Sequence, residues 1–157
     1  MVGALARLNL NYDKLVPQAK AVCEKIGLKP VNYNPFMNNV AQLIEVIHCF
    51  EDSFQLAKSL LENGIEDERP AVQVKAGRGT GAVEVPRGIL FHEYEYNKNG
   101  EVVWANCVIP TNQNHGNIQK DMEALVDGIK DRPQEEIQLM AEMLVRAYDP
   151  CVSCSTH

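Results

Sequence analysis

The sequence predicts an α+β fold that is mainly helical, with long packed helices and a small antiparallel β hairpin or sheet region. Three observations predict it. Apolar residues recur at helical spacing in long stretches on both sides of the chain's middle. Between those stretches the apolar pattern changes to that of short strands. The turn Asn97–Gly100, with the sequence Asn-Lys-Asn-Gly, is typical of a hairpin connection between the last two strands.

The first predicted helix spans Asp13 to Gly27. Asp13 can cap its start, Pro17 is tolerated in the first turn, and Gly27 is a typical stop. The segment Lys29–Phe36 is rich in Pro and Asn and predicts a loop.

A second, longer helix is predicted from Asn38 to Asn63, with Gly64 ending it. A broad apolar stripe runs along its length. At 1.5 Å per residue the helix is about 39 Å long, which is the diameter of a whole domain of this size. A helix of this length can therefore belong to a larger protein.

The remaining elements follow in two groups. The predicted strands are Val72–Val74, Ala82–Val85, Ile89–Tyr96 and Val102–Ile109. The predicted helices are Asn117–Asp131 and Pro133–Tyr148, the second with proline in its first turn. The short loop Gly77–Gly81 resembles a phosphate loop only superficially, and we interpret it as backbone that connects strands.

Length and charge exclude several classes. The chain has 157 residues, 45% of them hydrophobic, and a net charge of −6. These values are typical of one globular domain rather than a disordered segment. No apolar run reaches the roughly 18 residues of a membrane span. The acidic balance argues against nucleic acid as a partner. Because Arg7 interrupts the place where a secretory signal would be apolar, we expect a cytoplasmic protein.

The end of the chain carries the strongest chemical signal. Its residues 149–157 read Asp-Pro-Cys-Val-Ser-Cys-Ser-Thr-His, so Cys151, Cys154 and His157 follow one another at intervals of three. Two thiolates at this spacing can reach one soft metal ion, such as zinc or nickel. The alternative is a pair of structural cysteines near a frayed end. An odd count of five cysteines favours thiols over a disulfide framework.

This tail resembles the C-terminal signature of [NiFe] hydrogenase large subunits, Asp-Pro-Cys-x-x-Cys-x-x-His. Three internal segments agree in order. They are Met1–Asn9 (similar to Val-Gly-x-Leu-Ala-Arg-Leu-Asn), Glu84–His92 (similar to Glu-Ala-Pro-Arg-Gly, with Val85 in place of Ala) and Val108–Asn114. The last of these looks most like the soluble, cofactor-linked group of hydrogenases. The resemblance implies that the chain is part of the nickel–iron catalytic subunit, an oxidoreductase that reversibly splits H2 into protons and electrons.

The resemblance also implies the site. Cys151 would be a terminal nickel ligand and proton acceptor, and Cys154 would bridge nickel and an iron that carries CO and cyanide. Arg87, after Pro86, would lie over the open metal position, and Asp149 would orient it. Thr111 would donate its hydroxyl to a cyanide. Without the motif, Arg87 is an ordinary surface ion-pair residue, Asp149 a turn or capping residue, and Thr111 a residue at a strand end.

A second ion is implied near the end of the chain. His157 and the backbone carbonyl of Cys107 would bind Mg²⁺ or Fe²⁺ there, although a histidine ligand is unusual for magnesium. In the family an extension after this histidine is removed by a protease. The thiols of Cys23, Cys49 and Cys107 are expected to pack in the core.

The family's N-terminal Cys-x-x-Cys is not in this sequence, and two thiolates cannot hold the nickel–iron centre. We therefore expect residues 1–157 to be a single C-terminal portion of a large subunit, half of a larger fold whose N-terminal portion is absent. It would be active only with that N-terminal half, with an iron–sulfur small subunit, and with further electron-transfer subunits. Three alternatives stay open: a quinone-reducing relative, a zinc-type or scaffold domain completed by a partner, and a non-catalytic assembly module.

Overall fold

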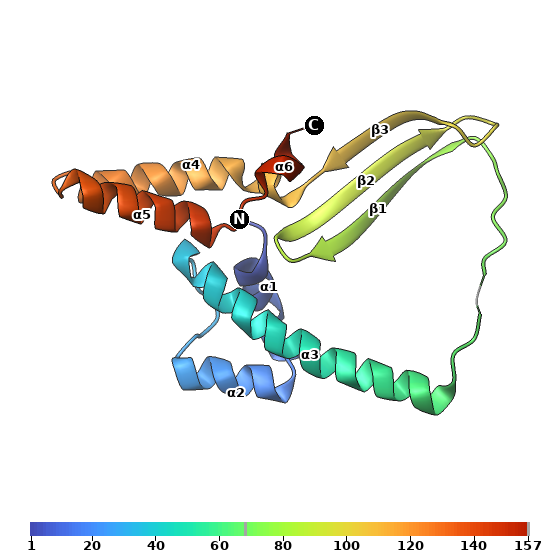
Figure 1. Ribbon diagram of the computed structural model, residues 1–157, viewed down its shortest axis with the longest axis horizontal. Helices are drawn as coiled ribbons and strands as arrows, with labels where there is room; N and C mark the ends of the chain where they lie inside the picture. Colours follow the sequence, from blue (N-terminus) through green and yellow to red (C-terminus); the bar gives the residue numbers. More distant parts are fainter. Residues whose placement is uncertain (68, 157) are drawn as a thin grey trace.

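The computed structural model describes residues 1–67 and 69–156 and confirms the α+β class (Figure 1). Two short 3-10 turns, Tyr12–Lys14 and Pro35–Met37, accompany the main elements. Those elements are α1 (Ala4–Asn11), α2 (Pro17–Ile26), α3 (Asn38–Asn63), β1 (Gly77–Val85), β2 (Gly88–Tyr96), β3 (Val102–Val108), α4 (Pro110–Ile129), α5 (Gln134–Ala147) and α6 (Val152–Ser155).

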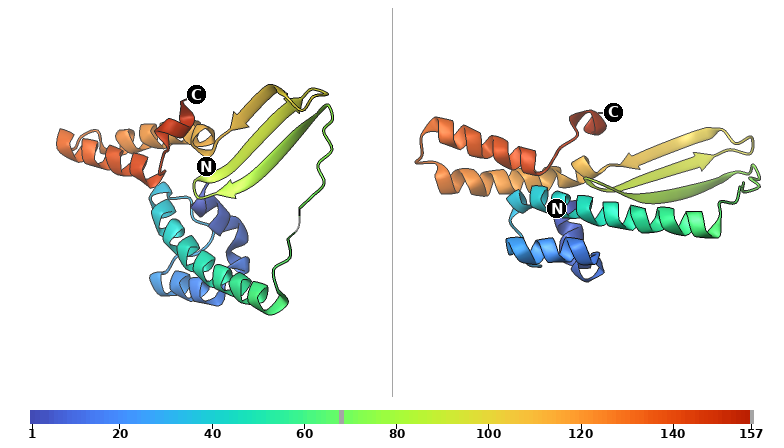
Figure 2. Two further views of the ribbon diagram at one scale, coloured as in Figure 1. Left: turned by 45° about the vertical axis from the view of Figure 1, so that its right-hand side comes forward. Right: turned by 60° about the horizontal axis from the view of Figure 1, so that its bottom comes forward.

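The elements extend as separate arms from a central region near the N-terminus (Figures 1 and 2). One arm is an antiparallel sheet with the strand order β1-β2-β3. A second is the C-terminal half of α3, and a third is the antiparallel pair α4 and α5. The tight turn between β1 and β2, where Val85 pairs with Gly88, lies at the central end of the sheet. This arrangement brings the turn, the N-terminal segment and the C-terminal tail together.

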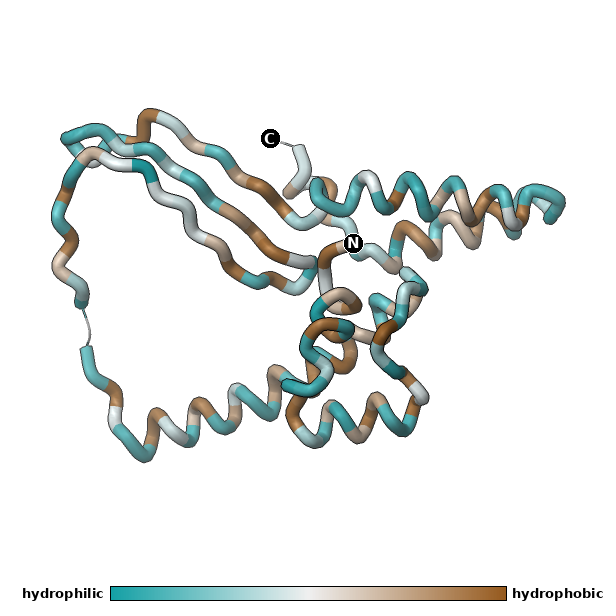
Figure 3. Tube along the Cα trace, turned by 180° about the vertical axis from the view of Figure 1, so that it is seen from behind, coloured by the Kyte–Doolittle hydropathy of each residue, from teal (hydrophilic) through white to brown (hydrophobic). Residues whose placement is uncertain are grey.

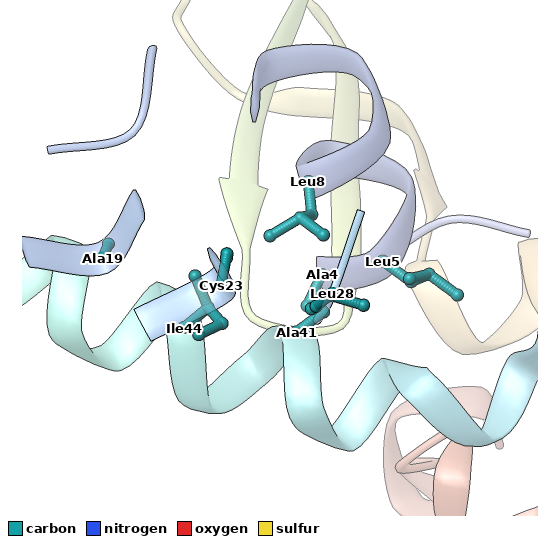
Figure 4. Close-up of a cluster of buried hydrophobic side chains, with 8 residues drawn as sticks. All are labelled: Ala4, Leu5, Leu8, Ala19, Cys23, Leu28, Ala41 and Ile44. Carbon is teal, nitrogen blue, oxygen red and sulfur yellow. The ribbon is translucent and has the colours of Figure 1, made fainter. Parts of the chain in front are cut away.

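The buried core lies between α1, α2 and α3 (Figure 4). Leu5 and Leu8 of α1 and Ile44 of α3 are its largest fully buried aliphatic side chains. Alanines at the closest approaches let the helices pack tightly. The cluster consists of Ala4, Leu5, Leu8, Ala19, Cys23, Leu28, Ala41 and Ile44. It fixes the orientation of α1, which carries Arg7 toward the sheet.

Local end signals predicted the helix boundaries well where they were present. Gly27 has a φ of 70°, and Leu28 and Gly27 donate to the carbonyls of Cys23 and Glu24, which closes α2. Pro17 occupies the first turn of α2, as predicted. Helix α3 has the predicted bounds, and Gly64, with a φ of 84°, ends it.

Other expectations were wrong. Val72–Val74 forms no strand, because no neighbouring strand pairs with it. Gly77–Gly81 does not connect strands but forms the first half of β1, because its backbone pairs with β2 from Tyr96 to His92. Helix α1 was not predicted, since its eight residues are too few to show a helical period. Asp13 lies in a 3-10 turn and Val16 precedes α2, so Asp13 does not cap that helix. Helix α4 begins at Pro110 rather than Asn117, because a proline at the first position begins the helix before its apolar period does.

Apolar residues recur along the sheet and along α3 (Figure 3), and many of them are exposed. The predicted stripe of α3 is buried only near its start, at Ala41 and Ile44, whereas Phe50 and Leu61 are 74% and 84% exposed. Val83 and Val103 of the sheet are also exposed. No helix in the described part of the chain is both long and apolar enough to cross a membrane. The exposed faces are thus typical of surfaces that other protein segments cover.

We expect Leu8→Ala to lower the free energy of unfolding by about 2–5 kcal/mol, because it leaves a cavity between α1 and α3. A urea titration followed by circular dichroism measures this change. Leu10→Ala, on the same helix at an 82% exposed position, is the control and should change the free energy by no more than about 0.5 kcal/mol. Equal effects of the two substitutions would contradict the position of the core.

Candidate functional site

The tail folds back as a single helical turn, α6, after Pro150 ends the preceding segment. It brings the sulfur atoms of Cys151 and Cys154 together, with the two Cα atoms 5.2 Å apart, and they form a disulfide. The expectation of five thiols is therefore wrong for this pair, while Cys23, Cys49 and Cys107 are free. Of these three only Cys23 packs in the core as expected, since Cys107 is half-buried and Cys49 is exposed on the part of α3 beyond the core. The physical reason for the disulfide is the separation of Cys151 and Cys154 by three positions in the sequence. A turn that directs two side chains to one metal ion also directs their sulfurs toward each other.

Thr111 connects the tail to α4. It lies in the first turn of the helix and is only 5% exposed. Its Oγ1 accepts a hydrogen bond from the backbone N–H of Cys151 at 3.1 Å. The hydroxyl hydrogen is not used in this bond and can be donated to another group beside Cys151. The structure thus brings Thr111 and Cys151 together, with Thr111 at a helix start rather than at a strand end.

Asp149 and Arg87 are in contact. The Nε of Arg87 donates to the backbone carbonyl of Asp149 at 2.6 Å, and its Nη2 donates to Oδ1 of the same residue at 3.2 Å. Gln42 of α3 donates to Oδ2 at 3.2 Å. Asp149 has a φ of 48°, a left-handed conformation that Asp tolerates better than most residues. This conformation turns the chain so that both its carbonyl and its carboxylate face Arg87.

The turn that carries Arg87 is held by Arg7 of α1. The Arg7 guanidinium donates to the carbonyls of Val85, Pro86 and Gly88 at 2.9–3.2 Å. It also forms a two-bond ion pair with Glu45 of α3, at 2.6 and 2.7 Å. Glu45, by accepting these hydrogen bonds, raises the pKa of Arg7 above its ordinary value. Arg7 is therefore a permanent cation at this position.

The N-terminal segment packs against the same turn through two glycines. A Cβ on Gly88 would lie 2.6 Å from the side chain of Val2 and 3.0 Å from Pro110, so no larger residue fits there. Gly3 lies against the carbonyl of Arg87. Asn114 of α4 accepts from the N–H of Val2 at 2.8 Å and donates to its carbonyl at 3.0 Å. The turn, the N-terminal segment and the start of α4 thus form one contact region.

Asn38 adds the last connection. Its side chain accepts from the N–H of Leu5 at 3.0 Å and donates to the carbonyl of Ala147 at 2.8 Å, and it is only 3% exposed. It therefore ties the start of α1 and of α3 to the end of α5, two residues before Asp149. Tyr148, also buried, donates to Asp121 of α4, and burial together with that carboxylate raises the pKa of Tyr148.

The remaining predicted site residues are Pro86, Cys107 and His157. Pro86 lies on the exposed side of the turn, with its carbonyl bonded to Arg7. Cys107 lies near the end of β3, with its Sγ 3.4 Å from Nδ1 of His92. His157, the predicted ligand of a second ion, lies outside the described residues. Within residues 1–67 and 69–156, no three His, Cys, Asp or Glu side chains are grouped closely enough to hold a metal ion.

The assembled site combines three chemical abilities. Two sulfur atoms converge and, once reduced, can act as soft ligands for one metal ion. Arg87 is a fixed cation with N–H donors, 40% exposed and oriented by a carboxylate. Thr111 is a buried hydroxyl donor. A site with soft ligands, a cation and a hydroxyl fits an anionic metal complex better than a bare cation.

Sequence reasoning missed four residues that position this site: Arg7, Asn38, Gln42 and Asn114. Arg7 lies inside a segment that already carried the family resemblance, so that segment was its signal. Asn114 likewise lies at the end of the segment Val108–Asn114, which also carried the resemblance, whereas Asn38 and Gln42 had no such signal. Asn and Gln on helices are ordinarily solvent-exposed, and nothing nearby in the sequence reveals a distant backbone partner.

Comparison with known proteins gives consistent results. A protein-family model described as nickel-dependent hydrogenase matches residues 1–157. The alpha subunit of sulfhydrogenase 2 from Pyrococcus furiosus is 37% identical, over 99% of this chain and 38% of that protein. The beta subunit of the NAD-reducing hydrogenase HoxS from Cupriavidus necator is 30% identical, over 99% of this chain and 34% of that protein.

A crystal structure of an NAD⁺-reducing [NiFe]-hydrogenase in the H2-reduced state superposes with a TM-score of 0.83 at 30% identity. The match covers 99% of this chain and 35% of that chain. The chain thus spans between about a third and two fifths of the relatives that it matches.

We expect Thr111→Val to loosen the tail. Valine removes the acceptor of the Cys151 N–H, and a lost hydrogen bond to a part-buried group costs about 1–3 kcal/mol. The amide of Cys151 should therefore exchange its hydrogen about tenfold faster or more, as measured by NMR or mass spectrometry. Thr111→Ser retains the hydroxyl and should exchange at nearly the wild-type rate. Unchanged exchange in Thr111→Val would contradict the contact.

Proposed function

The chain belongs to the nickel-dependent hydrogenase family, and from this premise we propose that it is part of the nickel–iron catalytic subunit that reversibly splits H2 into protons and electrons. The observation that carries the proposal is the meeting of Cys151 and Cys154 with Thr111 and Arg87 at one place. These residues come from the tail, the start of α4 and the β1–β2 turn.

The donor set fits half of a nickel–iron centre. Reduction of the Cys151–Cys154 disulfide, by two electrons and two protons, yields two thiols that can lose their protons to a soft metal. We propose that they supply two of four thiolate ligands. When bound, the centre, with CO and cyanide on its iron, supplies the Lewis acidity and redox chemistry for splitting H2.

We assign to the surrounding residues the roles that the family resemblance implies and that their chemistry allows. The Cys151 sulfur would hold a proton when H2 is split. Arg87, oriented by Asp149, donates hydrogen bonds to a cyanide and maintains positive charge above the site, with Pro86 beside it. Thr111 donates its hydroxyl to the other cyanide. His157 and the backbone carbonyl of Cys107 are proposed ligands of a Mg²⁺ or Fe²⁺ ion.

We further propose that residues 1–157 form the C-terminal portion of a large subunit, which acts together with an N-terminal portion. Two features support this. The described residues hold two of the four proposed thiolate ligands, and the apolar side chains of α3 and the sheet lie exposed. The proposed partners are further electron-transfer subunits together with an iron–sulfur small subunit, since the matched hydrogenases are named as subunits. The chain alone should not turn over H2.

We expect Cys151→Ser to abolish both nickel retention and H2 oxidation in the complex assembled with the N-terminal portion, because a serine oxygen is a poor ligand for nickel. Nickel is measured by elemental analysis, and CO and cyanide by their infrared bands. Cys49→Ser, at an exposed thiol away from the tail, is the control and should retain both properties. Normal nickel content in Cys151→Ser, or zinc in place of nickel in the wild type, would refute the assignment.

Metal uptake should also require reduction of the tail. A disulfide sulfur is not a thiolate, so we expect nickel to bind to the assembled apo complex after treatment with a thiol reductant and not before. The measurement is the nickel-to-protein ratio after gel filtration, with and without reductant. Equal nickel content under both conditions would contradict this requirement for reduction.

A further inference from the structure

The side chain of Arg7 uses all its N–H donors in hydrogen bonds, and most of these bonds go to the β1–β2 turn. A guanidinium has five N–H donors, and five hydrogen bonds from Arg7 account for all of them. Its Nε and one Nη2 hydrogen go to the two oxygens of Glu45. The other three go to the backbone carbonyls of Val85, Gly88 and Pro86. The Arg7 side chain is only 18% exposed, so water competes weakly for its partners other than the exposed carbonyl of Pro86.

The four carbonyls of the turn all lie against α1 and the segment before it. Three accept from Arg7, and the fourth, of Arg87, lies 3.2 Å from where a Cβ on Gly3 would stand. The backbone of the turn is thus held on this side, while the side chain of Arg87 extends to Asp149 in the tail. Arg87 is therefore fixed in two ways: the tail holds its side chain, and Arg7 holds the backbone of the residues on either side of it.

We propose that Arg7 is a positioning residue for the hydrogenase reaction, which holds the Pro86–Arg87–Gly88 backbone so that the Arg87 guanidinium keeps its place over the metal site. This inference rests on the proposed function of Arg87. Arg7 itself touches no residue of the tail in the described contacts and acts through the turn. Glu45 supports it, because the ion pair fixes the plane in which the guanidinium presents its remaining donors.

The proposed role depends on the planar guanidinium of Arg7, whose donors point in several fixed directions. Arg7→Lys is therefore the informative substitution. Lysine keeps the positive charge but has a single ammonium group with three donors, which cannot reach three carbonyls and both oxygens of Glu45. The assembled complex with Arg7→Lys should retain nickel, because Arg7 contacts neither Cys151 nor Cys154. Its kcat for H2 should fall about tenfold to a hundredfold at unchanged KM, since a small displacement of a positioned group has effects of this size.

Amide hydrogen exchange in residues 85–89 provides a readout that does not depend on activity. Arg7→Lys should increase exchange in this segment, and Glu45→Gln should do so to a smaller extent, which keeps the test valid if Arg7→Lys fails to assemble. Arg78→Lys is the matched control. Arg78 lies on the same hairpin and pairs with Glu93 at 2.6 Å, but it does not contact the turn. It should leave both kcat and exchange in residues 85–89 unchanged.

The outcomes separate the two proposals when Arg87→Lys is measured alongside. If Arg87→Lys loses turnover while Arg7→Lys keeps it, or if Arg7→Lys loses turnover without faster exchange in residues 85–89, the inference about Arg7 is overturned. A loss of turnover that only parallels a loss of nickel would also overturn it. If Arg87→Lys retains nickel and full turnover, the proposed role of Arg87 fails, and the exchange measurement still decides whether Arg7 holds the turn.

Discussion

The amides of Asn38 and Asn114 each pair with backbone groups of a segment more than a hundred positions away along the chain. Asn38 bonds Leu5 and Ala147, and Asn114 bonds both polar groups of Val2. Because both side chains are buried, a lost amide would leave backbone groups without water or a partner. The positions of the N-terminal segment and of the end of α5, from which the tail begins, depend on these satisfied polar contacts.

Apolar contacts and hydrogen bonds hold different parts of the structure together. The apolar cluster between α1, α2 and α3 fixes one side of the structure, while hydrogen bonds join the sheet turn, α4 and the tail. Hydrogen bonds are directional, so they determine where a guanidinium or a hydroxyl points, which apolar contacts do less strictly. This suits a site whose proposed work is to orient donors toward a metal complex.

Local patterns predicted the fold class, β2, β3, the last residues of β1 and the full extent of α3, because apolar periods and glycine stops act within a few residues. The glycine-rich start of β1 has no apolar pattern and was not predicted as strand. The start of α4 and the pairing of Cys151 with Cys154 were not predicted. The first lies before the apolar period of α4 begins, and the second depends on the redox state of the thiols. The family motifs pointed to Arg87, Asp149 and Thr111. The amides of Asn38 and Gln42, which help to hold them in place, gave no local signal, because their partners are distant.

The long separation of the paired segments has a kinetic consequence. The contact of Asn114 with Val2 spans 112 positions, and that of Asn38 with Ala147 spans 109. Contacts between residues so far apart in the sequence form slowly, because a large loop must close before any of them can form. During synthesis, α1 to α3 can pack as soon as they emerge, whereas the cysteines of the tail can meet Thr111 only when nearly all of the described residues have been made. Among residues 1–156, the order of translation therefore places the closing of this site late in folding.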